Sequence, residues 1–236
     1  MMKLVSKEKV AAIVPALDEE ANVGEVLKVL LSSKILDQVI LVDDGSIDKT
    51  AEIGEKLGAK VIRLPKVGGS GKGNAMRQGM KATNAEVVVF FDADLIGLSK
   101  DHISLLVEPM LKDNIVMCVG IRGRLFGLPG LFAKIDPLMA ISGERAARRD
   151  LFEKISDKFI QGFAVEPTLN YYCQKKRLPV KQVLLEKLDV VTKERKRGFL
   201  KGFISRIKMI FEIIKIRLMF IFYKHELTSV QKNNFK

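Results

Sequence analysis

The sequence of 236 residues lacks tryptophan and is poor in tyrosine, cysteine and histidine, with three, two and two residues respectively. No helix-turn-helix, zinc-finger or RNA-binding signature accompanies these few aromatic residues, which argues against a nucleic-acid-binding protein. Cys118 and Cys173 stand in apolar or mixed surroundings without the spacing of metal ligands. We therefore expect both to be buried free thiols in a reducing compartment.

A long hydrophobic run without charged residues is also missing. The most apolar stretch, Phe199 to Tyr223, is interrupted by Lys208, Glu212, Lys215 and Arg217. It is therefore a poor transmembrane span. We expect an amphipathic helix that packs against the domain or a second subunit, or alternatively lies on anionic lipid through its basic side chains.

What the sequence does have is a net charge of +12 and 47% hydrophobic residues. That hydrophobic content excludes general disorder, and the length suits one α/β domain with a short appendage. The positive charge favours anionic partners, namely phosphates, a nucleotide or an anionic membrane surface. Met1 to Lys9 is polar and unlike a signal peptide, so we expect a cytoplasmic protein, either free or peripheral on the inner face of the membrane.

Short apolar segments rich in Val and Ile alternate with segments of helical spacing. This alternation predicts an α/β fold, a mostly parallel sheet with right-handed crossovers and flanking helices. The predicted strands are Val10 to Leu17, Val39 to Val42, Lys60 to Arg63, Val87 to Phe91, Ile115 to Val119 and Leu178 to Leu184. The predicted helices are Asp18 to Leu31, Lys49 to Leu57, Asn74 to Ala82, Lys100 to Leu111 and Thr168 to Lys175.

The strand predicted from Val87 to Phe91 is the most informative, because this unbroken apolar run ends in Asp92 and Asp94. Such a run is typical of a strand buried on both faces of a parallel sheet. Ligands of open α/β sheets bind at the carboxyl ends of strands, and residues two apart share a face. The two carboxylates suit Mg²⁺ or Mn²⁺ that also holds phosphate oxygens. Alternatively, they only cap the helix that begins near Ser99.

Polar residues follow the other predicted strands as well. Asp18 to Asn22 offset a helix dipole or bind a ligand. Asp44, in a turn that Gly45 permits, can accept hydrogen bonds from a ribose or a base edge. Lys72 lies in the glycine-rich segment 68–74, which is not a Walker A loop. We interpret Lys72 as a cation near a diphosphate, the alternative being a flexible basic turn.

The second half of the sequence is less regular. Arg122 and Arg124 stand in a long loop, Gly120 to Pro137, and suit an anionic acceptor group. The arginines of Ser142 to Asp150 begin another structured unit, or equally form a solvated helix face. Glu166 stands ahead of a predicted helix, where it serves as a cap, orients an acceptor hydroxyl or acts as a base.

Four ordered motifs resemble the nucleotide-sugar half of family 2 glycosyltransferases: Pro15 to Glu20, Val42 to Ser46, Gly71 to Asn74 and Asp92 to Asp94. The resemblance implies the GT-A fold, a Rossmann-like sheet with an acceptor-binding second half. It implies a metal held by Asp94 with Asp92. The residues that it assigns to the nucleotide sugar are Pro15, Ala16, Leu17, Glu19, Asp44, Lys72, Asp92 and Ala93.

The later motifs look like glucosyl-3-phosphoglycerate synthases. This looser likeness implies that Arg122 and Arg124 lie near the acceptor and that Glu166, with Asp94, is catalytic. Those synthases supply a late histidine to the metal, whereas residues 189–197 here contain none. We expect the two histidines of this sequence, His102 and His225, to be surface residues.

The resemblance implies a metal-dependent transferase that moves a sugar from a UDP- or GDP-sugar to an acceptor hydroxyl or phosphate. The expected reaction is non-processive, because polymer-making members of the family carry a Gln-x-x-Arg-Trp motif and this chain has no tryptophan. Inversion and retention at the anomeric carbon both stay open. Phosphorylated, polyprenyl-phosphate and glycan acceptors stay open too. A distant alternative is a non-catalytic nucleotide-sugar-binding protein.

For the domain organisation, we expect one domain over residues 1–198. Its nucleotide-sugar half ends at about residue 98, and its acceptor half covers 99–198. The amphipathic helix and tail then cover 199–236. A homodimer would result if this helix packs against a second subunit, and packing against its own domain is the alternative.

Overall fold

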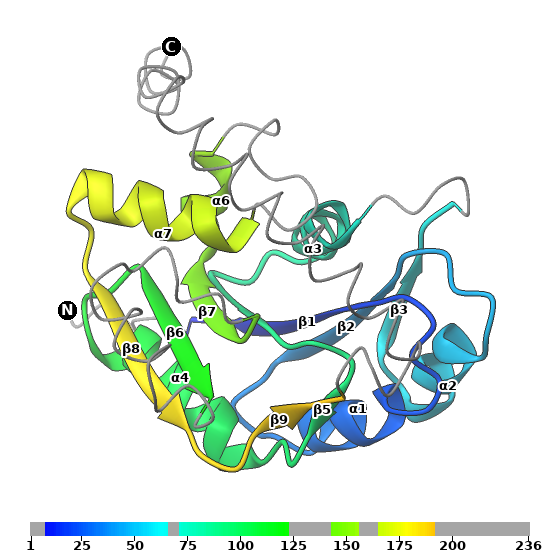
Figure 1. Cartoon of the computed structure of the whole chain (residues 1–236). Coiled ribbons are helices and arrows are strands. Elements are labelled where there is room, and N and C mark those ends of the chain that lie inside the picture. Colours follow the sequence, from blue (N-terminus) through cyan, green and yellow to red (C-terminus); the bar gives the residue numbers. More distant parts are fainter. Residues whose placement is uncertain (1–7, 66–70, 123–142, 156–164, 192–236) are drawn as a thin grey trace, which may run out of the picture.

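A computed structural model describes residues 8–65, 71–122, 143–155 and 165–191 (Figure 1). A seven-stranded sheet in the order β3-β2-β1-β4-β7-β6-β8 forms the centre of this part. Every neighbouring pair is parallel except the two that involve β7. The strands are β1 Val10–Ala16, β2 Gln38–Asp43, β3 Lys60–Arg63, β4 Val87–Phe90, β6 Met117–Arg122, β7 Arg145–Arg148 and β8 Val180–Leu185. The predicted α/β fold with a mostly parallel sheet is confirmed.

Helices cover both faces of the sheet. They are α1 Val23–Leu31, α2 Thr50–Leu57, α3 Lys72–Lys81, α4 Lys100–Lys112, α6 Arg149–Glu153 and α7 Val165–Lys176. In the view of Figure 1, α3, α6 and α7 lie above the sheet, and α1, α2 and α4 lie below it. Each face has its own hydrophobic core, one built on α3, α6 and α7 and the other on α1 and α4.

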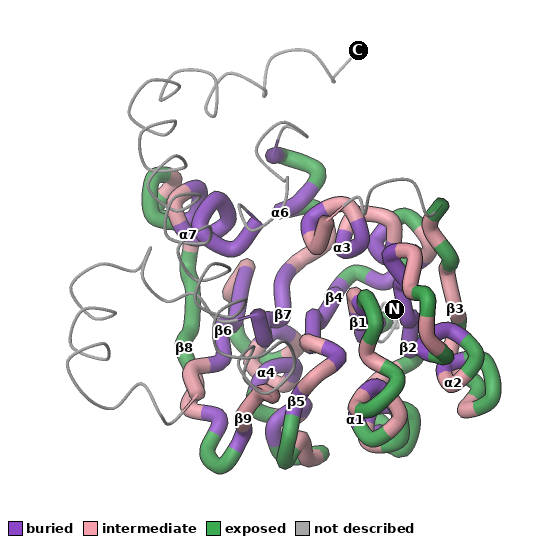
Figure 2. Tube along the Cα trace, turned by 45° about the vertical axis from the view of Figure 1, so that its right-hand side comes forward, coloured by how far each residue is buried: buried purple, intermediate pink, exposed green. Residues whose placement is uncertain are grey.

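The central strand β4 is buried on both faces, as its apolar run predicts (Figure 2). Val88 and Phe90 pack into the core with α3 and α7, whereas Val87 and Val89 pack into the core with α1 and α4. β1 lies beside β4 in parallel register, so both strands deliver the residues that follow them to the same edge of the sheet. A predicted site at that edge therefore has a structural basis.

Of the two interpretations of the segment around Arg145, the structure agrees with a further structured unit and not with a solvated helix face. Residues Arg145–Arg148 form β7, which runs antiparallel between β4 and β6. The Arg145 side chain is fully buried. Two small residues, Ala146 and Ala147, let the strand fit between its neighbours, one facing each core. The tertiary pairing thus overrides the polar character of the segment.

Three helix starts also differ from the predictions. α1 begins at Val23 rather than Asp18, because Asp18 has a φ of 54° and belongs to a turn. α3 begins at Lys72 rather than Asn74. α7 begins at Val165 rather than Thr168, which places Glu166 inside its first turn.

Two expectations about single residues have opposite outcomes. Cys118 and Cys173 are buried free cysteines, as expected. Burial raises the pKa of the Cys118 thiol to about 11 and that of Cys173 to about 12, so both stay protonated. His102, expected at the surface, is buried under the turn that follows β8. His225 and the predicted helix over Phe199 to Tyr223 lie outside the described residues.

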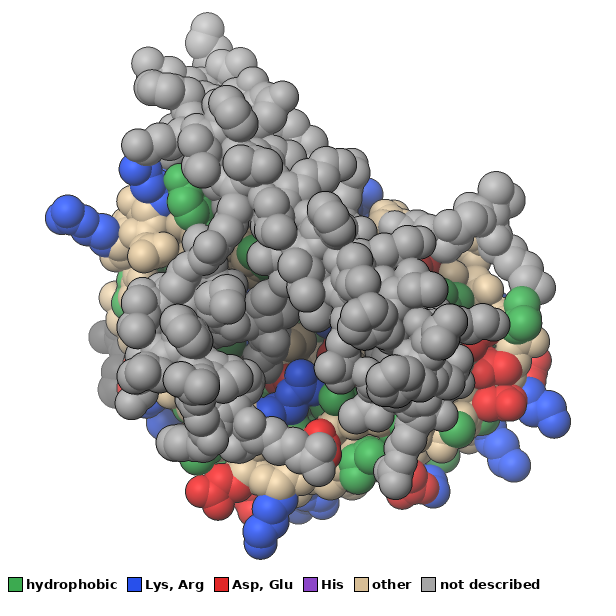
Figure 3. All heavy atoms as spheres, viewed as in Figure 1, with side chains coloured by type: hydrophobic (Ala, Val, Ile, Leu, Met, Phe, Trp, Pro, Cys, Tyr) green, Lys and Arg blue, Asp and Glu red, His purple; other side chains and the backbone are tan. Residues whose placement is uncertain are grey.

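Within the described residues, no helix is both long and apolar enough to span a membrane. On the face drawn in Figure 3, acidic and basic side chains alternate along the lower and right-hand edges, where α4, α1 and α2 lie. The described part of this face thus shows mixed charges rather than one continuous basic surface.

Gly79 of α3 tests how closely this helix packs on the sheet. A Cβ at Gly79 would lie 2.4 Å from Ile13 Cγ2 and 3.1 Å from Val42 Cγ2, both in buried side chains. We expect Gly79→Ala to lower the free energy of unfolding by about 1–3 kcal/mol, since the core cannot take up the methyl group without strain. Urea unfolding followed by circular dichroism measures this.

The matched control is Gly24→Ala in α1, where the new Cβ would meet Ile53 Cγ2 at an ordinary 3.5 Å. This variant should unfold like the wild type or at slightly higher urea, because alanine favours the helix. Equal stability of the two variants would contradict the close packing of α3.

Candidate functional site

The loops that follow β1 and β2 are tied to each other by hydrogen bonds. Asp18 N–H donates to Ser46 Oγ at 2.9 Å, and Ile47 N–H donates to Asp18 Oδ1 at 2.9 Å. Glu19 N–H donates to Thr50 Oγ1 at 2.8 Å. The end of β1 and the two loops form a platform. It carries residues that the resemblance assigns to the nucleotide sugar: Pro15, Ala16, Leu17, Glu19 and Asp44.

Asp44 connects this platform to the glycine-rich loop. Its backbone N–H donates to Ala16 O at 2.8 Å, and its carboxylate accepts from Gly71 N–H at 2.9 Å. Asp44 is 5% exposed. Gly71, which follows the undescribed segment 66–70, is therefore fixed to the end of β2. Lys72, the next residue, starts α3 at the same edge of the sheet.

The Lys72 ammonium bridges two carboxylates from distant parts of the chain. Its Nζ lies 2.7 Å from Asp92 Oδ1, at the end of β4, and 2.9 Å from Glu166 Oε1, in the first turn of α7. Burial alone would lower the pKa of Lys72, but the two carboxylates outweigh it and raise that pKa well above 10.5. Lys72 therefore stays charged and joins the two halves of the predicted site.

Arginine side chains complete the electrostatic environment of Asp92. Burial would raise the pKa of this carboxyl, but Lys72, followed by Arg122 and Arg145, lowers it below the usual 3.8. Arg122, at the end of β6, lies 3.6 Å from Glu144 Oε1. Asp92 is therefore ionised at neutral pH. Arg124, the second predicted acceptor residue, lies outside the described residues.

Three residues that sequence reasoning did not assign to the site belong to it. Gly143 lies against Asp92, since a Cβ there would come within 2.6 Å of the carboxylate. Glu144 is fully buried beside Arg122. Arg145 Nη1 lies 3.4 Å from both Glu166 O and Asn170 Oδ1. The sequence signal for these residues was the pair Gly143-Glu144 directly before the arginines of β7. The pair reaches the site only because β7 pairs with β4 and β6, which the sequence does not indicate.

Asp94 lies just beyond Asp92, where the chain turns into a second small sheet. β5 Leu95–Ile96 pairs antiparallel with β9 Asp189–Val190, and Val191 N–H donates to Asp94 O at 3.1 Å. Ala93, between the two aspartates, is buried. The predicted metal residues thus lie at the carboxyl end of β4, and the segment after β8 returns to them.

The donor set fits a hard divalent cation held jointly with a substrate. The described residues contain no group of three His, Cys, Asp or Glu side chains that could hold a metal alone. Mg²⁺ typically needs only one or two protein carboxylates when phosphate oxygens and water complete its shell. Glu166 Oε2 is buried and has no hydrogen-bond partner among the described residues. Glu166 therefore has an oxygen that can accept a hydroxyl proton, while its other oxygen shares Lys72 Nζ with Asp92.

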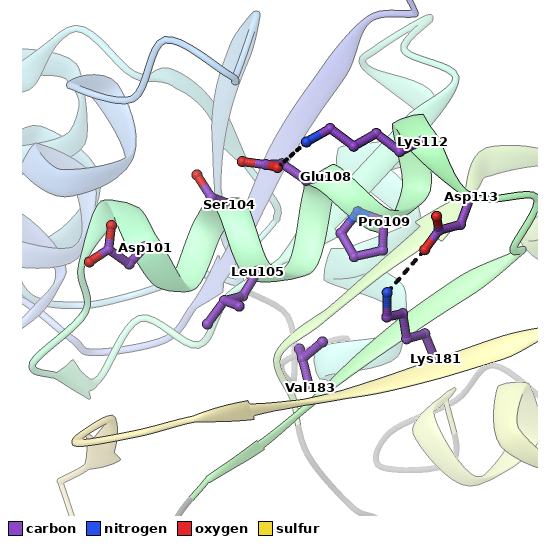
Figure 4. A pocket seen from close by; sticks show the side chains of 9 residues that line it. All are labelled: Asp101, Ser104, Leu105, Glu108, Pro109, Lys112, Asp113, Lys181 and Val183. Atoms are coloured by element: carbon purple, nitrogen blue, oxygen red, sulfur yellow. Dashed lines mark hydrogen bonds and ion pairs between the residues drawn. The ribbon is translucent and has the colours of Figure 1, made fainter.

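A separate cavity of 480 Å³ lies between α4 and β8 (Figure 4). The salt bridges Glu108–Lys112 and Asp113–Lys181 lie among its lining side chains. None of the predicted site residues lines it. The residues that converge at the ends of β1, β2 and β4 therefore remain the candidate site.

Removing the central ammonium tests the charge network. We expect Lys72→Met to lower the free energy of unfolding by about 3 kcal/mol, because it leaves two carboxylates in a largely buried place without their partner. The pKa of Asp92 is lower in the folded state than the 3.8 of the unfolded state. The contribution of the Asp92–Lys72 pair to stability is therefore complete above pH 3.8 and is lost as the pH falls through the folded pKa. The pKa of Lys72 is raised in the folded state, so the contribution of its charge to stability is complete at every pH below the unfolded value of 10.5.

The destabilisation should therefore be full at neutral pH and shrink in acid, first as the unpaired carboxylates of the variant take up protons and then as Asp92 of the wild type does, as measured by urea unfolding at several pH values. Lys28→Met is the control, since it breaks an exposed pair with Glu25 and should change stability little. An equal effect of the two substitutions would contradict the central role of Lys72.

Comparison with known proteins agrees with this geometry. The family model of Glycosyl transferase family 2 matches residues 11–172. A glucosyl-3-phosphoglycerate synthase from Mycolicibacterium paratuberculosis is 30% identical over 190 residues, covering 66% of this chain and 57% of that protein. The chain spans only 48–61% of the length of the first curated relatives that it matches.

Solved structures of the glucosyl-3-phosphoglycerate synthase from Mycobacterium tuberculosis share the fold. The complex with Mn²⁺, UDP-glucose and phosphoglyceric acid has a TM-score of 0.66 at 29% identity, over 84% of this chain and 79% of that chain. The complex with Mg²⁺ and UDP has a TM-score of 0.66 at 28% identity, with the same coverage. The expected GT-A architecture is confirmed, and the chain belongs to glycosyl transferase family 2.

Proposed function

We propose that this protein transfers a sugar from a nucleotide-diphosphate sugar to the hydroxyl of a phosphorylated acceptor, with Mg²⁺ or Mn²⁺ as cofactor. The observation that carries the proposal is the Lys72 bridge between Asp92 and Glu166, at the edge where the nucleotide platform lies. UDP-glucose and phosphoglyceric acid, bound in the similar synthase, are the first donor and acceptor to test. A UDP- or GDP-linked donor is compatible with the residues.

The donor contacts follow from the two loops and α3. Ala16, Leu17 and Glu19 would hold the base and ribose, and Pro15 would belong to the same nucleotide-sugar site. Asp44 would lie beside the base, although its carboxylate also fixes Gly71. A bound divalent ion supplies Lewis-acid stabilisation of the departing diphosphate. Asp94 would hold that ion, with Asp92 as a second ligand, and Ala93 would line the donor site between them.

Lys72 contributes its own positive charge to the leaving group. Its ammonium is held by two carboxylates and stays protonated, so it can stabilise negative charge that develops on the diphosphate. The same nitrogen holds Glu166 near the reacting centre. Arg122 would attract the phosphate or carboxylate of the acceptor, and Arg124 would act with it.

Glu166 is the side chain placed to act on the acceptor. It is 3% exposed, one oxygen binds Lys72, and the other lacks a hydrogen-bond partner among the described residues. In an inverting reaction this oxygen would remove the acceptor proton. In a retaining reaction it would position the acceptor or the donor sugar. Product stereochemistry, read by nuclear magnetic resonance, separates the two.

The metal assignment predicts a specific binding defect. Mn²⁺ should tighten UDP binding to the wild type, and Asp94→Asn should reduce this metal-dependent gain by more than about tenfold. UDP affinity without metal should not change, because the platform of β1 and β2 is intact. Isothermal titration calorimetry with and without Mn²⁺ measures both quantities.

Asp113→Asn serves as the control, since Asp113 pairs with Lys181 at the distant cavity. It should keep the full metal effect. If Asp94→Asn also kept it, the assignment of Asp94 to the metal would be wrong.

The role of Glu166 predicts a kinetic defect. We expect Glu166→Gln to lower kcat for transfer from UDP-glucose to 3-phosphoglycerate by roughly 10²–10⁴-fold, as for removal of a general base. UDP affinity in the presence of Mn²⁺ should stay close to the wild-type value. A coupled assay of UDP release measures turnover.

Glu153→Gln removes an exposed partner of Arg149 and should leave turnover unchanged. Wild-type turnover in a folded Glu166→Gln variant would rule out a catalytic role for this carboxylate.

A further inference from the structure

His102 is buried at a junction between two segments that lie 84 residues apart. It is the third residue of α4 and 7% exposed. Ser99 N–H donates to His102 Nδ1 at 3.2 Å, and Nε2 lies 2.8 Å from Glu186 O. Because a backbone N–H only donates and a carbonyl only accepts, Nδ1 accepts from Ser99 and Nε2 donates to Glu186 O. One imidazole thus caps α4 and holds the turn after β8.

The turn after β8 contacts the segment before α4 at a second place. Gly97 has a φ of 77°, and a Cβ there would lie 2.7 Å from Lys187 O. Only glycine adopts this backbone conformation without strain and leaves room for the carbonyl. The turn and the Asp94–His102 segment are therefore packed backbone against backbone.

The same two segments then pair as the small sheet that ends at the metal residue. Ile96 pairs with Asp189 and Leu95 with Val190. Val191 N–H closes the ladder on Asp94 O at 3.1 Å. The contacts of His102, Gly97, β5 and β9 form a continuous clasp, and its last hydrogen bond is made by Asp94 itself. A two-stranded sheet of two residues each is not stable without such support.

We infer that His102 is a positioning residue for the metal-binding aspartate. Through Glu186 it anchors the turn that feeds β9, and β9 fixes the backbone of Asp94. This inference rests on the proposed function, in which Asp94 holds the divalent ion. Partners that orient a metal ligand without touching the metal typically change metal affinity by 10- to 100-fold when removed.

The two functions of the ring can be separated by near-isosteric substitutions. Glutamate and glutamine at this position of a helix both complete a capping box with the serine N–H. An ionised glutamate, however, cannot donate to Glu186 O, whereas the glutamine amide can. His102→Glu should therefore keep the cap and lose the clasp, and His102→Gln should retain both.

The experiment measures UDP binding by titration calorimetry with and without Mn²⁺. We expect His102→Glu to reduce the Mn²⁺-dependent gain in affinity by about tenfold, with metal-free UDP binding unchanged. His102→Gln should restore most of that gain. Hydrogen exchange of the metal-free protein should be faster in His102→Glu at residues 94–96 and 189–191, where the clasp has opened.

A folded His102→Glu variant with the wild-type Mn²⁺ effect would overturn the inference and leave the proposed function intact. If wild-type UDP binding does not respond to Mn²⁺ or Mg²⁺, the proposed function fails and the inference with it. If His102→Glu does not fold, Gly97→Ala decides the question, because its methyl group displaces Lys187 O.

Gly58→Ala is the matched control for Gly97→Ala. Gly58 has a φ of 89°, and a Cβ there would meet nothing within 4 Å. Its substitution therefore introduces backbone strain without displacing the turn after β8. Gly97→Ala should lose the Mn²⁺ effect, and Gly58→Ala should keep it. A full Mn²⁺ effect in Gly97→Ala would overturn the inference.

Discussion

The Lys72 ammonium is the interaction on which the candidate site depends. Asp92 and Glu166 both lie within 3 Å of the same nitrogen. Without it, two carboxylates in a region of low dielectric would repel each other strongly. The ammonium therefore fixes the distances among the end of β4, the start of α3 and the first turn of α7. The predicted nucleotide-sugar half and the predicted acceptor half thus meet at a single positive charge.

The antiparallel strand β7 explains how the second half reaches this site. Inserted between β4 and β6, it places Gly143 against the Asp92 carboxylate and Glu144 beside Arg122. It also buries Arg145 under the first turn of α7. A purely parallel order would join β4 directly to β6 and leave no element to carry these groups. Within the described seven-stranded sheet, the antiparallel β7 thus brings Gly143, Glu144 and Arg145 to the end of β4.

Local sequence patterns predicted those elements whose burial is visible in the hydrophobic pattern of the segment itself. The run Val87 to Phe91 predicted both the central strand and the place where Asp92 and Asp94 emerge, because burial on both faces leaves a clear hydrophobic signal. Residues Arg145–Arg148 carry no such signal, since their strand depends on pairing with β4 and β6. His102 appeared to be a surface residue, because its partner Glu186 lies 84 positions away. Contacts between distant segments decided both cases.

The distribution of charge leads to a different interpretation of the net charge of +12. Residues 192–236 contain 12 of the 40 Lys and Arg residues but only 3 of the 28 Asp and Glu residues. In the described part of the site, by contrast, three cations face three carboxylates, and Asp94 adds a fourth: Lys72, Arg122 and Arg145 against Asp92, Glu144 and Glu166. The described side chains of the site thus offer a free diphosphate no excess positive charge. A diphosphate that carries a divalent ion is nearly neutral, so this balance of charges favours the metal-bound donor.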